Sequence, residues 1–388
     1  MQHSLNLDTI PLGKLFFLRL ENAFLLADTN DTIEILSQFD NLESEIISWC
    51  QLKGESFLHK TMLKGCVTYL LRKDSARSFI TFSLELELAP REIGLAPYGV
   101  MAQKASPDYH FVLNHKDELW SKNVNKMYED AKAAQWNATS AIEWSAIPEF
   151  APKVEFAIAQ IMTYLIENEL SALYIPAKFL SQISPYFLPI PMLLSSIIGD
   201  EARHIEAFTK RANATHLGVQ YSTLTTQQSL FSLFKENNYL AASFLLHIMG
   251  EGTFIDLLKF LEDCAPDSPT KKLFNLARKD EARHVAYGMN NVKMALLSNP
   301  HRVEILKDSV LRRKVYLDEV SGESTLLLES LAVFAGGGDS TSELSRGFEM
   351  VENLKVKMEA NRTKRLVECG IDEELAFELS KAHTPNFM

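Results

Sequence analysis

The sequence predicts an all-α protein with a four-helix bundle at its centre. Four long stretches between about residues 152 and 300 carry apolar side chains at helical spacing. A five-residue polar motif recurs in two of these stretches. Long helices that repeat polar groups on an apolar face are typical of a bundle with a site in its core. We therefore divide the chain into a mostly helical N-terminal extension (1–150), the bundle (151–300) and a helical C-terminal extension (301–388).

The first two bundle helices are predicted from their starts and their apolar spacing. The first begins at Pro152 and continues through the apolar residues Phe156, Ile158, Ile161, Met162, Leu165 and Ala172. We expect Pro176 to kink or end this helix, because proline lacks the N–H group and its ring clashes with the preceding turn. The second begins near Pro191, since proline suits a first helical turn, and continues to about Arg211.

The third helix is expected from about residue 226 to residue 263. The fourth starts with Ser268 as its cap and Pro269 in its first turn, and it stops before Asn299 and Pro300. In the flanks, residues 78–89 could form a strand or two. The run Gly336-Gly337-Gly338-Asp339 predicts a break, after which residues 342 to about 368 indicate a polar amphipathic helix.

Charge and cysteine usage narrow the class of protein. The net charge of −11 argues against a nucleic-acid partner, which requires a basic surface. Four cysteines lie far apart without metal-ligand spacing, as in a reduced cytosolic protein. No signal-peptide pattern opens the chain, and the longest apolar stretch (185–198) contains three prolines and is too short to cross a bilayer. We expect a soluble, cytoplasmic protein with no membrane partner.

The motif that recurs is Asp-Glu-Ala-Arg-His, at residues 200–204 and again at 280–284. Each copy contains Glu-x-x-His: Glu201 with His204, and Glu281 with His284. Residues three apart lie on one face of a helix, so both side chains can reach the same metal ion. One such pair is usually a solvated helix surface. Two identical copies on apolar faces favour a metal site, because buried charges are costly unless they are paired or bind a metal.

Two further carboxylates are expected from the other two helices. On the third helix the candidate is Glu251, which shares its face with Phe244, Ile248, Phe254 and Leu258. Glycines on both sides of Glu251 cost helix stability and indicate a bulge or space kept clear for oxygen or substrate; a plain packing requirement is the alternative. On the first helix the candidates are Glu169, on the apolar face, and Glu167, on the more polar face, and we choose Glu169 as the ligand.

This layout resembles the ferritin-like di-iron carboxylate superfamily, which includes ribonucleotide reductase small subunits and di-iron oxygenases. The resemblance covers roughly residues 150 to 300. It implies a ferritin-like four-helix bundle whose metal ligands and catalytic residues are Glu169, Glu201, His204, Glu251, Glu281 and His284. It also implies that Asp200 and Asp280 accept hydrogen bonds from ligand histidines, and that Arg203 and Arg283 pair with carboxylates.

Two positions bear on the reaction. Reductase small subunits that store a tyrosyl radical place the tyrosine four residues after the first ligand histidine, where this sequence has Phe208. His247 lies one turn before Glu251 and is either a third histidine ligand, as in some N-oxygenases, or a core histidine beside the site.

The preferred hypothesis is an oxidoreductase, a monooxygenase or oxidase, in which two iron ions activate dioxygen to oxidise a small organic substrate. An external electron donor is expected, since the sequence has no flavin or nucleotide fingerprint. The alternatives are a radical-generating or ligand-binding homologue of the reductase small subunit, with manganese and iron (Mn/Fe), and an iron-storage bundle. A homodimer is a possible assembly. The pattern does not specify the substrate.

Overall fold

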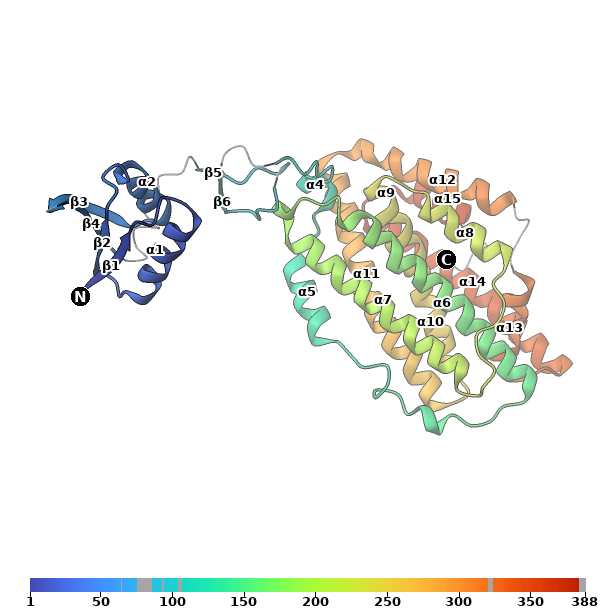
Figure 1. The fold of residues 1–388 in the computed structure, drawn as a ribbon. Coiled ribbons are helices and arrows are strands. Elements are labelled where there is room, and N and C mark those ends of the chain that lie inside the picture. Colours follow the sequence, from blue (N-terminus) through green and yellow to red (C-terminus); the bar gives the residue numbers. More distant parts are fainter. Residues whose placement is uncertain (64, 75–85, 93, 104–106, 320–323, 384–388) are drawn as a thin grey trace. The chain divides into compact units, whose positions relative to one another are not determined.

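The computed structural model describes residues 1–388 except 64, 75–85, 93, 104–106, 320–323 and 384–388. The chain forms two compact units, Met1–Leu86 and Glu87–Met388, each with its own apolar core. They are called the N-terminal unit and the helical unit below (Figure 1).

The N-terminal unit is a four-stranded sheet with two helices. Its elements are β1 (Gln2–Asp8), α1 (Lys14–Leu26), β2 (Thr32–Ser37), α2 (Glu43–Lys53), β3 (Ser56–Leu63) and β4 (Cys66–Arg72). The strand order is β1-β2-β4-β3, with β1 parallel to β2 and the other pairs antiparallel. Phe16, Leu20 and Phe24 of α1 and Ile46 and Trp49 of α2 supply helical side chains to the core of this unit.

The prediction that residues 1–150 are mostly helical is wrong for this unit. Every second residue of β2 is buried, and Val67, Tyr69 and Leu71 of β4 are buried in the same way. This two-residue period places one face of each strand in the core. Most of the strand suggested at 78–89 lies outside the described residues, and Leu86–Leu88 (β5) pairs with Met101–Gln103 (β6).

The helical unit contains the remaining helices. They are α4 (Lys116–Leu119), α5 (Val124–Ala133), α6 (Pro152–Leu180), α7 (Pro189–Asn213), α8 (Leu224–Phe234), α9 (Tyr239–Ser243), a π-helix (Phe244–Gly250), α10 (Glu251–Cys264), α11 (Ser268–Ser298), α12 (Val303–Glu319), α13 (Thr325–Gly336), α14 (Thr341–Glu368) and α15 (Glu373–His383). Single 3₁₀ turns occur at Trp144–Ala146, Pro185–Phe187 and Pro300–Arg302.

The predicted four-helix bundle is confirmed, with α6 packed along α7 and α10 along α11 (Figure 1). Two apolar clusters divide its core. Ile197 of α7 and Tyr287 of α11 belong to one cluster, and Phe208 of α7 and Phe274 of α11 belong to the other. The recurring motif lies between these residues on both helices, so an apolar layer closes the polar centre on each side along the bundle.

The helix boundaries differ from expectation in three places. Pro176 does not end α6, which continues to Leu180 with the proline buried inside it. The expected third helix is broken after α8, and the chain restarts at Asn238, whose side chain accepts a hydrogen bond from the backbone N–H of Ala241. The cap of α11 is Asp267 and not Ser268, because the Asp267 carboxylate accepts the Thr270 N–H.

The predicted break at residues 336–339 is confirmed: α13 ends at Gly336, and Gly337 adopts a left-handed conformation with φ of 80°. The helix that follows begins with a capping box between Ser340 and Glu343. Among the described residues, only the segment Tyr239–Cys264 is long and apolar enough to cross a membrane, and 94% of its most apolar window is buried inside the protein. It is therefore a core helix of the bundle.

Because the two units have separate cores, we expect two separable unfolding transitions. Ile35→Ala in the N-terminal unit and Leu258→Ala in the helical unit each remove a fully buried side chain. Each should destabilise its own unit by about 2–5 kcal/mol. Differential scanning calorimetry should show each substitution lowering one transition and leaving the other in place. One cooperative transition lowered by both substitutions would show that the units fold as one.

Candidate metal centre

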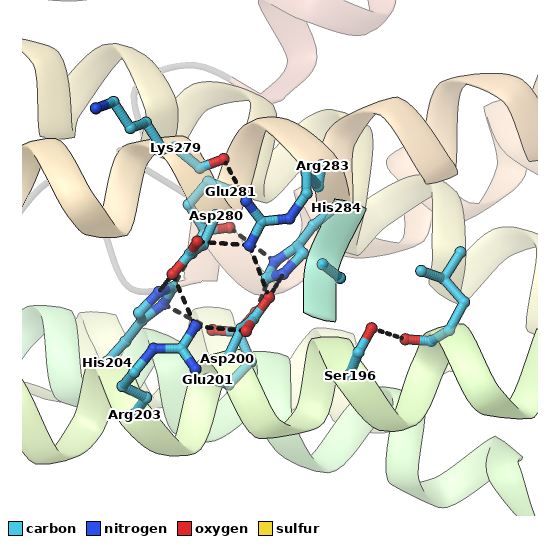
Figure 2. Close-up of polar contacts among 12 residues, drawn as sticks. Ser196, Asp200, Glu201, Arg203, His204, Lys279, Asp280, Glu281, Arg283 and His284 are labelled. Carbon is cyan, nitrogen blue, oxygen red and sulfur yellow. Dashed lines mark hydrogen bonds and ion pairs between the residues drawn. The ribbon is translucent and has the colours of Figure 1, made fainter. Parts of the chain in front are cut away.

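The two motif copies face each other from α7 and α11 in the middle of the bundle (Figure 2). Glu201, His204, Glu281 and His284 are all at most 1% exposed. Their burial follows from helix geometry, because the motif lies in phase with Ile197 and Phe208 on α7 and with Ala277 on α11. The structure thus brings together both Glu-x-x-His pairs that the sequence predicted as ligands.

The carboxylates and imidazoles form two overlapping groups whose donor atoms lie within 4.8 Å of one another. One group consists of Glu169, Glu201, His204 and Glu281, and the other of Glu201, Glu251, Glu281 and His284. Glu201 and Glu281 belong to both groups. They could therefore contribute to both halves of a di-metal group, whereas Glu169 and Glu251 each belong to one group only.

The orientation of each imidazole ring shows which of its two nitrogen atoms faces the centre. His204 Nδ1 lies 3.4 Å from Glu169 Oε1 and 3.3 Å from Glu281 Oε1. His284 Nδ1 lies 2.9 Å from Glu201 Oε1 and 3.3 Å from Glu281 Oε2. In both histidines the other nitrogen, Nε2, points to an aspartate. Nδ1 is therefore the atom available to a metal ion.

Unpaired polar atoms support this reading. Among the described residues, eight buried oxygen and nitrogen atoms of the centre have no hydrogen-bond partner. They are Glu169 Oε1, both carboxylate oxygens of Glu201 and of Glu281, Glu251 Oε1, His204 Nδ1 and His284 Nδ1. Buried polar atoms are almost always satisfied in folded proteins. When ionised, the four buried carboxylates carry four negative charges, which two divalent cations would balance, so these residues fit a di-metal group.

The close packing of these groups shifts their proton affinities. Burial and the negative charges of Glu201 and Glu281 raise the pKa of Glu169 well above its ordinary value. Burial lowers the pKa of His204, but the charge of Glu169 and the hydrogen bond to Asp280 outweigh it, so the pKa is raised well above its usual range. The charges of Glu201 and Glu281 likewise overcome burial at His284 and raise its pKa. The cluster therefore attracts positive charge, whether protons or metal cations.

Each histidine is held by the aspartate of the opposite helix. His204 Nε2 donates to Asp280 Oδ2 at 3.1 Å, and His284 Nε2 donates to Asp200 Oδ2 at 3.2 Å. These crossed bonds orient both rings with Nδ1 inward, as metal-binding histidines require. Burial raises the pKa of Asp280, but hydrogen bonds from His204 and Arg203 outweigh it and hold the pKa below its usual range.

The motif arginines complete the network. Arg203 donates to Asp200 at 2.5 Å and to Asp280 at 2.9 Å, and Arg283 donates to Asp280 at 2.5 Å and to Asp200 at 3.2 Å (Figure 2). Each arginine therefore joins α7 to α11. The charges of the two aspartates and the two arginines neutralise one another. These four residues therefore contribute no net positive charge to balance the carboxylates of the centre.

Sequence reasoning missed two residues of this network, Gln135 and Trp136, just after α5. The Trp136 indole donates to Asp280 Oδ2 at 2.7 Å, and its ring stacks against His204 with centroids 6.3 Å apart. The Gln135 amide donates to Asp200 Oδ1 at 2.9 Å and accepts from Arg203. The sequence carried no signal for either, because they lie in a connection without a period or a repeat.

The first-helix alternatives are separated by their surroundings. Glu169 is buried beside His204, whereas Glu167 accepts a hydrogen bond from Gln227 on the outer side of α6. The structure therefore places Glu169, and not Glu167, at the centre. His247 belongs to neither donor group; its Nδ1 donates to Glu251 Oε2 at 2.7 Å.

The expected bulge beside Glu251 is present as the π-helix Phe244–Gly250, which ends immediately before this residue. Such one-turn π segments occur frequently at functional sites. Gly252 has a packing role, since a Cβ there would lie 2.6 Å from Arg365 Nε. That glycine thus makes room for an arginine of α14 and not for oxygen or substrate.

Comparison with known proteins gives the fold. No protein-family model matches the chain, and no curated protein matches it in sequence. Among solved structures it is similar to a variant of the R2-like ligand-binding oxidase with an aerobically reconstituted Mn/Fe cofactor (TM-score 0.51, 13% identity). It is also similar to another variant with an Fe/Fe cofactor (TM-score 0.50, 14% identity). Each match covers 66% of this chain and 95% of the other. The helical unit therefore has the ferritin-like bundle fold.

The raised pKa values predict that metal binding releases protons. Glu169, His204 and His284 bind protons more tightly than ordinary glutamate and histidine, and a metal ion must displace those protons. Affinity for Co²⁺ should therefore increase with pH, and proton release should persist at pH 8, where ordinary glutamate and histidine hold almost no proton. Calorimetric titrations in buffers of different ionisation enthalpy measure this release. Binding without proton release at pH 8 would contradict the prediction.

Proposed function

We propose that this protein is a di-metal oxidoreductase that uses dioxygen to oxidise a small organic molecule. The observation that carries the proposal is the pair of buried donor groups sharing Glu201 and Glu281. In ferritin-like di-metal proteins two glutamates and two Glu-x-x-His pairs from four helices form such a centre. Here α6 and α10 each supply one glutamate, Glu169 and Glu251, and α7 and α11 each supply one Glu-x-x-His pair.

The role of each ligand follows from its place. Glu169 and His204 would hold one ion, Glu251 and His284 the other, and Glu201 and Glu281 would bridge them. Iron at both positions is our first assignment, and Mn/Fe is the alternative. Held by these residues, the two ions would supply the redox chemistry needed to reduce dioxygen.

The chain's own residues would exclude water and hold the ligands in place. Apolar layers that include Phe208 and Phe274 on one side and Ile197 and Ile248 on the other enclose the centre. Exclusion of water strengthens the electrostatic interactions inside and prevents side reactions. The crossed hydrogen bonds that His204 donates to Asp280 and His284 donates to Asp200 would keep the imidazoles oriented during turnover.

Two observations favour an oxidase or oxygenase over a tyrosyl-radical generator or an iron-storage bundle, and both also fit the alternative of a ligand-binding Mn/Fe homologue. The similar solved structures are of proteins named as ligand-binding oxidases with Mn/Fe or Fe/Fe cofactors. Phe208, beside His204 with ring centroids 6.3 Å apart, lacks the phenol that a radical-storing subunit uses there. We propose an external electron donor, and a cytoplasmic location because all four cysteines are free thiols. Hydroxylation, N-oxygenation, desaturation and oxidative cleavage all remain within this proposal.

Metal content tests the ligand assignment. Protein expressed with adequate iron should bind about two metal ions per chain. Alanine at Glu169, Glu201, His204, Glu281 or His284 should lower this loading because each change removes a donor. Glu167→Ala is the matched control on the same helix and should keep both ions. Metal analysis by mass spectrometry measures the loading. Two tightly bound ions in all five ligand variants, or a loss confined to Glu167→Ala, would overturn the assignment.

Electron paramagnetic resonance separates the oxygenase from a radical generator. If oxidising power passes directly to a bound substrate, no long-lived tyrosyl radical should accumulate when oxygen is added to the reduced protein. Oxygen consumption should instead rise when a small-molecule substrate from a metabolite library is present. Phe208→Tyr is an informative companion, because it restores a phenol beside His204. A persistent tyrosyl signal of near-stoichiometric yield in the unmodified protein would favour the radical generator.

A further inference from the structure

Glu251 differs from the other carboxylates of the centre in having a dedicated partner. Its Oε2 accepts a 2.7 Å hydrogen bond from His247 Nδ1, while its Oε1 has no partner among the described residues. Both side chains are at most 4% exposed. One oxygen of Glu251 is therefore held by the protein, and the other is left for the centre.

His247 is itself held in place by α11. Its ring meets the Tyr287 ring edge-on, with centroids 5.5 Å apart and an interplanar angle of 80°. A Cβ at Gly288 would lie only 2.3 Å from His247 Cβ, so only glycine allows α11 to approach this closely. Tyr287 and Gly288 thus leave the imidazole little room to turn.

The backbone around Glu251 gives a second reason why the Glu251 carboxylate needs a hydrogen bond to hold it. His247 lies in the middle of the π-helix Phe244–Gly250, and Glu251 is the first residue of α10. Glu169, by contrast, lies in the interior of the long helix α6. The backbone that leads into Glu251 is therefore irregular, and a hydrogen bond to the Glu251 side chain can fix the position of its carboxylate.

We propose that His247 is a positioning residue for Glu251, which it holds with one oxygen directed at the metal position built on His284. This inference rests on the proposed metal centre. His247 is not a ligand in it, because its Nδ1 is committed to Glu251 and the ring belongs to neither donor group. Since Glu251 belongs to only one group, loss of His247 affects one of the two ions.

The geometry of the amide side chains provides a matched pair of variants. In asparagine the amide nitrogen is as many bonds from Cα as Nδ1 is in histidine, so His247→Asn keeps a donor for Glu251. In glutamine the amide nitrogen is one bond farther from Cα, as Nε2 is in histidine, and it therefore does not take the place of Nδ1 beside Glu251. His247→Gln and His247→Leu therefore remove the bond, and the exposed His301→Leu serves as a control for loss of a histidine.

The experiment is a calorimetric titration of the full chain with Co²⁺ as the only metal. Unmodified protein and His301→Leu should bind two ions. His247→Leu and His247→Gln should bind one ion normally and the other roughly ten- to a hundredfold more weakly. His247→Asn should restore most of that affinity. In a Glu251→Ala background His247→Leu should have no further effect, because the residue acts through Glu251.

Circular dichroism checks that each variant is folded, and Gly288→Ala gives an independent test by displacing His247 without removing it. Unchanged binding of both ions by folded His247→Leu and Gly288→Ala would overturn the inference while leaving the metal centre intact. Equal loss in His247→Asn and His247→Leu, or additional loss in the Glu251→Ala background, would also overturn it. Failure of the unmodified protein to bind two ions would refute the metal centre itself.

Discussion

The structure depends on one electrostatic constraint: four carboxylates and two imidazoles are buried together in the bundle core. Such a cluster is costly without counter-charge, because burial in a low-dielectric core penalises unpaired ions. The surrounding aspartates and arginines pair among themselves and so leave that charge unbalanced. The apolar layers on both sides prevent water from relieving it. The fold therefore concentrates negative charge at a point where positive ions are the natural complement.

The recurrence of the motif gives the centre an approximate internal symmetry. Each copy supplies a glutamate that belongs to both donor groups, a histidine, and an aspartate for the histidine of the other copy. The helices α7 and α11 must pack together for either histidine to be oriented. Gln135 and Trp136 break this symmetry, since an amide supports Asp200 and an indole supports Asp280. The two donor groups are thus chemically similar but not equivalent.

The bundle and the positions of the Glu-x-x-His pairs were predictable because both follow from periodicity within single helices. Glu169 was separable from Glu167 by helical phase alone. The roles of Trp136 and His247 could not be deduced, since they depend on which side chains other segments bring alongside. The sheet of the N-terminal unit was missed although β2 and β4 bury every second side chain, because its strands alternate along the chain with the helices α1 and α2 in a segment that was interpreted as mostly helical. Asp267 was overlooked as a cap because Ser268 beside it is also a good capping residue.

The π-helix before Glu251 has a consequence for tracing this protein's ancestry. A π segment holds more residues per turn than an α-helix, so it is equivalent to an insertion within a continuous helix. Each inserted residue would turn an ordinary α-helix by roughly 100°, whereas a π segment such as Phe244–Gly250 can absorb an insertion within its wider turns. A relative lacking this segment would keep the carboxylate of α10 in place while everything before it shifted in register. Equivalent positions should therefore be counted from Glu251 on the C-terminal side of the π-helix and from a residue before Phe244 on its N-terminal side, because a gap-free alignment through this segment would pair the wrong residues.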